Sequence, residues 1–125
     1  MRTWIMDEEN TPQRFPLRRL IEIARQEASY TAPVCIATRA RGYGASIRNM
    51  EIALEDVDSI EVDLREVEGL AEGTREWFYD LDLEFPSRGL RLGLHDSTAL
   101  YIESDDATLC TSIAANFQNT RNASP

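Results

Sequence analysis

The only cluster of side chains with the ingredients of nucleophilic catalysis is His95-Asp96-Ser97-Thr98. A catalytic triad needs members that converge from separate segments on an oxyanion hole, and the sequence has no Gly-x-Ser-x-Gly motif. Asp and Ser between two alternating apolar runs are ordinary turn formers. The cluster therefore predicts a turn. Because His95 is the only histidine, the sequence indicates a protein that is not an enzyme.

A second group with chemical potential is the row Asp80, Asp82 and Glu84, whose alternate spacing places the carboxylates on one face of a strand. Interpreted as an EF-hand loop, the row fails, because the sixth position is Phe85 instead of Gly and the twelfth is Arg91 instead of Glu. Carboxylates two residues apart on a strand lie about 7 Å apart, and the sequence offers no clear further ligands. We predict neither a metal site nor a cofactor. Acid-base work by buried carboxylates, for instance Asp80 with Asp63, stays open.

The two cysteines indicate no metal site either. Cys35 and Cys110 lie far apart in a chain with no Cys-x-x-Cys motif, so a four-ligand zinc site is not expected. Both are predicted to be small buried residues. The N-terminus lacks the apolar core of a signal peptide, and no apolar run approaches the roughly 20 residues that span a bilayer. We therefore expect a cytoplasmic protein with reduced thiols and no membrane insertion.

The element that must position the carboxylate row is a strand from Glu76 to Phe85. Its apolar residues fall on odd positions and its acids on even ones, which is the pattern of a half-buried strand, and only Phe78 breaks the alternation. We expect this strand to be central. One face would pack on the core, and the other would present carboxylates to water or to a partner. The odd-numbered residues are Trp77, Tyr79, Leu81, Leu83 and Phe85.

The elements on either side predict an α+β fold in one domain, residues 1–125. An apolar stripe predicts an N-terminal helix at about 15–30. About six short strands at about 34–103 follow, joined by turns, and a C-terminal helix at about 105–118 is capped from Ser104-Asp105-Asp106. The order predicts an antiparallel β-meander, as a curled sheet or partly open barrel, capped by the last helix. Residues from Asn119 on should fray.

Residues 50–67 fit both a helix face and two alternating strands. We favour strands at Met50 to Leu54 and Ile60 to Leu64, because a helix would stack Glu51 on Glu55 without a basic residue between them. Residues 68–74 then form a loop. Arg41-Gly42-Tyr43-Gly44 is expected to be a hairpin loop.

Charge is distributed unevenly along the chain. The net charge is −9, and every basic residue is Arg. Residues 1–50 carry eight Arg and five acids (+3), whereas residues 51–84 carry two Arg and thirteen acids (−11). Such a field repels nucleic acid and anionic membranes and attracts basic protein surfaces. If the strand with Glu61 and Asp63 lies beside the central strand, like charges would meet across the ladder, at up to about 1 kcal/mol for each opposed pair.

The runs Met50-Glu-Ile-Ala-Leu-Glu-Asp-Val-Asp-Ser-Ile-Glu-Val62 and Ala99-Leu-Tyr-Ile-Glu-Ser-Asp-Asp-Ala-Thr-Leu-Cys110 resemble bacterial pleckstrin-homology-like domains over about residues 34–118. The resemblance implies a partly open barrel plugged by a helix and used for binding. It also implies that Arg39, Arg41 and Arg48 occupy the place where lipid-binding members carry basic residues.

The leading hypothesis is a non-enzymatic intracellular protein-binding module, either an immunity- or antitoxin-type inhibitor or a regulatory adaptor. Its acidic face would bind a basic protein through Asp80, Asp82, Glu84, Glu61 and Asp63. The alternative is a pleckstrin-homology-like module that binds an anionic ligand through Arg39, Arg41 and Arg48. A carboxylate-based enzyme is the third hypothesis, and homo-oligomer formation stays open.

Overall fold

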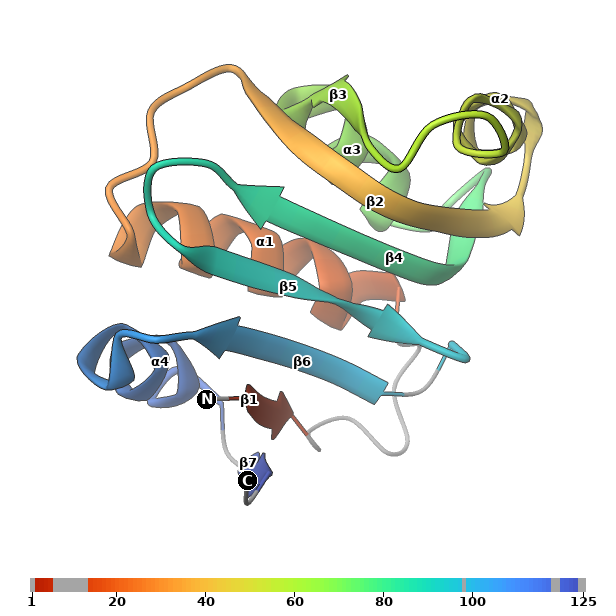
Figure 1. The fold of residues 1–125 in the computed structure, drawn as a ribbon. Helices are drawn as coiled ribbons and strands as arrows, with labels where there is room; N and C mark the ends of the chain where they lie inside the picture. Colours follow the sequence, from red (N-terminus) through yellow and green to blue (C-terminus); the bar gives the residue numbers. More distant parts are fainter. Residues whose placement is uncertain (1, 6–13, 98, 118–119, 124–125) are drawn as a thin grey trace.

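The computed structural model describes residues 2–5, 14–97, 99–117 and 120–123 (Figure 1). The chain forms an antiparallel sheet with four helices in the described ranges, which confirms the predicted α+β class. In chain order the elements are β1 (Arg2–Ile5), α1 (Arg14–Glu27), β2 (Val34–Tyr43), α2 (Ala45–Ala53), β3 (Ile60–Asp63), α3 (Leu64–Ala71), β4 (Trp77–Phe85), β5 (Leu90–His95), β6 (Ala99–Ser104), α4 (Ala107–Ala114) and β7 (Thr120–Ala123).

The strands follow the order β3-β2-β4-β5-β6-β1-β7, and every neighbouring pair is antiparallel. β4, β5 and β6 form the predicted meander, and β1 lies between β6 and β7. Within the described strands the order is linear, so the sheet is open, with β3 and β7 at its edges. β4 is an interior strand of this sheet, as its sequence predicts.

The hydrophobic core lies between one face of the sheet and the helices α1, α3 and α4 (Figure 1). Cross-strand partners such as Leu83 with Leu92, and Leu92 with Ile102, carry the apolar alternation across the meander, and all three are fully buried. Burying one such side chain contributes about 1.5–3 kcal/mol. α1 covers this face with Leu17, Leu20, Ile21 and Ala24, and the two cysteines are buried, as predicted.

An irregularity in β4 explains why Phe78 breaks the alternation. Arg41 of β2 lies opposite Asp80, but Gly42 lies opposite Phe78, so Tyr79 is an extra residue on the β4 side. Phe78 consequently returns to the core at 3% exposure, whereas Tyr79 is 38% exposed. The expectation that Tyr79 shares the core face is wrong, because the extra residue reverses the alternation.

The predicted strand at Met50 to Leu54 is wrong, since residues 45–53 form the helix α2. The helix ends before Glu55, so the repulsion between Glu51 and Glu55 does not arise inside it, and Glu51 pairs with Arg48 at 3.8 Å. Ile52 does lie on a polar face, at 47% exposure. The expected hairpin loop at residues 41–44 is also wrong, because β2 continues to Tyr43 and leads directly into α2.

Asp63 is the last residue of β3 and the N-cap of α3. The predicted strand at Ile60 to Leu64 is therefore confirmed to Asp63, and the predicted loop at 68–74 is wrong for residues 68–71, which belong to α3. Its side chain accepts a hydrogen bond from the backbone N–H of Glu66 at 2.8 Å, so it caps the helix. Leu64, Val67 and Ala71 then form a buried stripe. Asp63, Glu66 and this stripe together are a helix-start signal visible in the sequence.

The terminal elements are close to the prediction. α1 begins one residue before the predicted helix at about 15–30 and ends three residues earlier, and α4 lies within the predicted helix at about 105–118. Asp106 caps α4 by accepting a hydrogen bond from the Leu109 N–H at 3.1 Å. The expectation that the C-terminus frays is wrong for residues 120–123, which pair with β1. In the described part of the chain, no helix has the length and apolar character needed to cross a membrane.

The N-terminus of α2 is stabilised by a carboxylate from a distant part of the sequence. Glu76 accepts hydrogen bonds from the N–H groups of Ser46 at 2.8 Å and Ile47 at 3.3 Å. Gly44 makes this contact feasible, because its φ is 121° and a Cβ there would lie 2.1 Å from the Glu76 side chain. Burial raises the pKa of the Glu76 carboxyl, but the hydrogen bonds outweigh burial and hold that pKa below its ordinary value.

We predict that Glu76→Gln lowers the free energy of unfolding at neutral pH by roughly 0.5–2 kcal/mol, the usual cost of a lost helix cap. A lowered folded-state pKa gives stability above the unfolded pKa of about 4.3 and loses it as pH falls through the folded value. Urea unfolding at pH 7 and at pH 3 should therefore give a larger difference at pH 7. Glu27→Gln, at an exposed carboxylate of α1, is the control, and equal differences at both pH values would contradict the prediction.

Candidate functional site

Most of the predicted site residues lie on the face of the sheet opposite α1. Register places Arg39 opposite Asp82, Arg41 opposite Asp80 and Arg91 opposite Glu84, so each acid of the row faces an arginine or lies beside one. Tyr101 and Trp4 continue this face on β6 and β1. It is called the polar face below.

Asp80 is buried, although its position in the row predicts exposure. Only 1% of the residue is exposed, and its Oδ2 lies 3.1 Å from Arg41 Nη2 and 3.5 Å from Arg39 Nη2. The β5–β6 turn covers it, because the N–H of Asp96 donates to Asp80 Oδ1 at 3.0 Å. A buried carboxylate needs a counter-charge, and here two guanidinium groups supply it.

Asp82 is the centre of a second cluster. His95 Nε2 lies 3.2 Å from Asp82 Oδ1, and the Tyr101 hydroxyl donates a hydrogen bond to the same oxygen. Burial and this hydrogen bond raise the pKa of the Tyr101 phenol. Gly93 leaves room for the ring, since a Cβ there would lie 2.9 Å from Tyr101 Cε1. The Arg2 guanidinium lies over the Tyr101 ring, 4.2 Å from its centroid.

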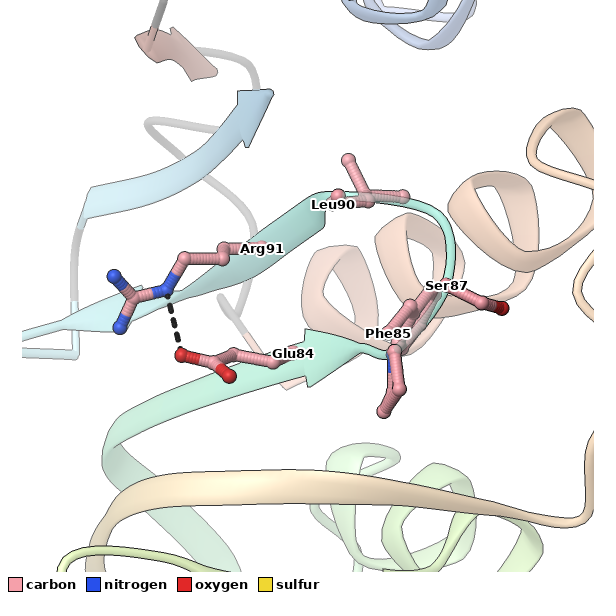
Figure 2. Close-up of a pocket in the computed structure, with 7 residues that line it drawn as sticks. Glu84, Phe85, Ser87, Leu90 and Arg91 are labelled. Carbon is pink, nitrogen blue, oxygen red and sulfur yellow. Dashed lines mark ion pairs between the residues drawn. The ribbon is translucent and has the colours of Figure 1, made fainter. Parts of the chain in front are cut away.

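A ladder of ion pairs continues the polar face toward β1. Glu84 pairs with Arg91 at 3.3 Å, Arg91 lies 4.0 Å from Glu103, and Glu103 pairs with Arg2 at 2.8 Å. Figure 2 shows Glu84 and Arg91 side by side at a pocket of about 290 Å³ at the β4–β5 turn. Ser87 also lines this pocket, and the other lining residues are Phe85, Pro86, Gly89 and Leu90.

On the polar face, the predicted acidic residues of β4 are therefore paired with basic residues of β2 and β5. The like-charge contact between the strand of Glu61 and the central strand does not occur, because β3 pairs with β2, and β2 separates it from β4. Asp63 and Asp80 lie opposite distant ends of β2, at Val34 and Arg41, so they form no carboxylate pair. Arg48 lies on α2, away from the contact that joins Arg39 and Arg41.

The predicted turn after β5 is confirmed at Asp96 and Ser97, whereas His95 is the last residue of β5 and Thr98 lies outside the described residues. Asp96 and Ser97 adopt positive φ values of 51° and 62°. His95 faces Asp82 and not Ser97, so the three side chains form no triad. No group of three or more His, Cys, Asp or Glu in the described ranges is arranged to hold a metal ion.

Among the described residues, four carboxylates without a counter-charge lie close together in the sequence, in residues 51–63. This segment contains six acids and no basic residue. Within the described part of the structure, no hydrogen bond or ion pair engages the side chains of Glu55, Asp56, Asp58 or Glu61, and all four are exposed. We call residues 51–63 the acidic segment. The uneven distribution of charge along the sequence points to this region, but the period-two pattern directed attention to β4 instead.

No protein-family model matches the chain, and neither the curated proteins nor the solved structures compared with it give a match. Function therefore has to be inferred from the geometry and charge of the chain itself.

The shared contact of Arg39 and Arg41 with Asp80 predicts coupling between the two arginines. Arg39→Met or Arg41→Met alone should lower the free energy of unfolding by less than about 1 kcal/mol, because one half-exposed guanidinium remains. The double variant should lower it by up to about 3 kcal/mol, because the buried carboxylate is then unpaired. A double-mutant cycle by urea unfolding measures this. Arg65→Met with Arg75→Met is the control, and additive effects at positions 39 and 41 would contradict the prediction.

Proposed function

We propose that this chain is a non-enzymatic protein-binding module whose acidic segment binds a basic protein, as an immunity- or antitoxin-type inhibitor or a regulatory adaptor does. The observation that carries the proposal is the exposed acidic segment, whose charges have almost no counter-charge in the described structure. Glu61 and Asp63 of the predicted site belong to it. Asp80, Asp82 and Glu84 are engaged within the polar face and contribute less free charge.

The acidic segment also exposes apolar groups. Val57, between Asp56 and Asp58, is 50% exposed, and Ile52, which follows Glu51, is 47% exposed. Protein interfaces combine desolvated apolar contacts with a charged rim, and complementary charge raises the rate of association. A basic partner with a small apolar patch at its centre fits this composition.

The alternative, binding of an anionic ligand through Arg39, Arg41 and Arg48, has less support. Arg39 and Arg41 both contact the buried Asp80, which cancels one of their two charges. Arg48 is 70% exposed but lies on α2 and pairs with Glu51. The resemblance to pleckstrin-homology-like domains, the cytoplasmic location and the absence of a nucleic-acid partner stay predictions.

The proposal predicts which charges matter for binding. Neutralising Glu55, Asp56, Asp58 and Glu61 to Gln or Asn should weaken capture of a basic protein about tenfold or more, because the attractive field is lost. The measurement is a pull-down from the native host at low and moderate salt, followed by titration of the captured protein against each variant.

The matched control removes the same number of charges elsewhere. Glu22, Glu27, Glu72 and Asp105, changed to Gln or Asn, keep the acidic segment and should retain the partner. If the acidic-segment variant binds the captured protein as tightly as the wild type, the proposal is wrong. If both variants lose it equally, net charge and not this segment is responsible, and the proposal is also wrong.

A further inference from the structure

β3 is an edge strand, and its unpaired side lies within the acidic segment (Figure 1). The N–H of Leu64 donates to the carbonyl oxygen of Pro33 at 2.9 Å, which makes these two residues a hydrogen-bonded pair of the β2–β3 ladder. Such pairs alternate along an antiparallel ladder, so Val62 and Ile60 also direct their backbone groups toward β2. The N–H and C=O of Glu61 therefore point away from β2, toward the open edge.

The side chains of β3 alternate in a way that suits an added strand. Glu61 lies opposite Ile36, which lies opposite Glu84, so Glu61 belongs to the polar face of the sheet. Ile60 and Val62 lie on the other face and are only partly buried against the core. A strand added beside β3 would therefore place polar groups next to Glu61 and apolar groups next to Ile60 and Val62.

The charges of β3 determine which kind of strand can pair with its open edge. A second copy of β3 would bring Glu61 and Asp63 against acids of the same kind, and like charges directly opposed in a ladder are destabilising. A strand with basic residues at alternate positions would place them opposite these acids. An exposed edge strand can pair with a strand of another chain. The acids of β3 disfavour pairing with a second β3 and favour pairing with a basic segment.

We infer that β3 binds its partner by strand addition: an extended segment that alternates basic with β-branched apolar residues pairs antiparallel along Ile60–Asp63. This inference rests on the proposed function and specifies how the acidic segment is used. Backbone hydrogen bonds to Glu61 would hold the segment, and the alternate side chains would set its register.

The test uses two substitutions at one position. Glu61→Gln removes the charge and keeps the outward N–H, whereas Glu61→Pro removes both. Proline is tolerated on an edge strand where the lost N–H faces solvent, so the pairing of β3 with β2 should persist. The probe is an eight-residue peptide of alternating Arg and Val, and its dissociation constant is measured by fluorescence anisotropy. We expect Glu61→Pro to weaken binding at least tenfold more than Glu61→Gln does. Equal losses would overturn the inference.

N-methylated peptides test the same contact without altering the protein, should Glu61→Pro fail to fold. In antiparallel addition the Arg opposite Glu61 directs its N–H at β3, so N-methylation of the Arg residues should abolish binding and N-methylation of the Val residues should not. Binding that survives both methylated sets, or no binding of the unmethylated peptide, overturns strand addition. The proposed function fails by a different result, when the four-acid variant retains the captured partner.

Discussion

The burial of Asp80 between Arg39 and Arg41 is the contact on which the polar face depends. A carboxylate that is 1% exposed is stable as an ion only beside cations, and the two arginines reach it because β2 lies next to β4 in the matching register. The turn at Asp96 covers the pair and links it to the end of β5. Strand order, register and the β5–β6 connection together therefore place the counter-charges and the covering turn that the buried Asp80 carboxylate needs.

The acidic residues of the chain fall into two groups, those paired on β4 and those of the acidic segment. The row on β4 is neutralised by Arg39, Arg41 and Arg91 and, at Asp82, is joined to His95 and Tyr101. The acidic segment receives no comparable set of arginines, and it lies along an edge of the sheet where a partner can reach it. A chain that pairs its central acids and leaves its peripheral ones free retains a localised negative field for association.

Sequence reasoning succeeded where the pattern is local and long. The alternation in β4 predicts an interior strand, and the stripe from Leu17 to Ala28 predicts α1. It failed at α2, because this helix is shorter than the pattern at residues 50–67 from which a helix was judged. The N-terminus of α2 is also capped by Glu76, which lies 30 residues from Ser46 in the sequence. Sequence reasoning also missed α3, although Asp63 and Glu66 offered a cap signal. The candidate site could be predicted only as a list of charges, because their pairing depends on strand order.

The sequence by itself determined the α+β class, the antiparallel meander, the two terminal helices and the strong acidity of residues 51–84. These follow from side-chain periodicity and composition, which are properties of neighbouring residues. Only the tertiary structure decided that β2, and not β3, lies beside β4. That choice joins Arg41 to Asp80 across 39 residues of sequence, and it determines which carboxylates are neutralised and which remain free. The alternation within one strand specifies which residues share a face, but it does not specify which other strand lies beside it.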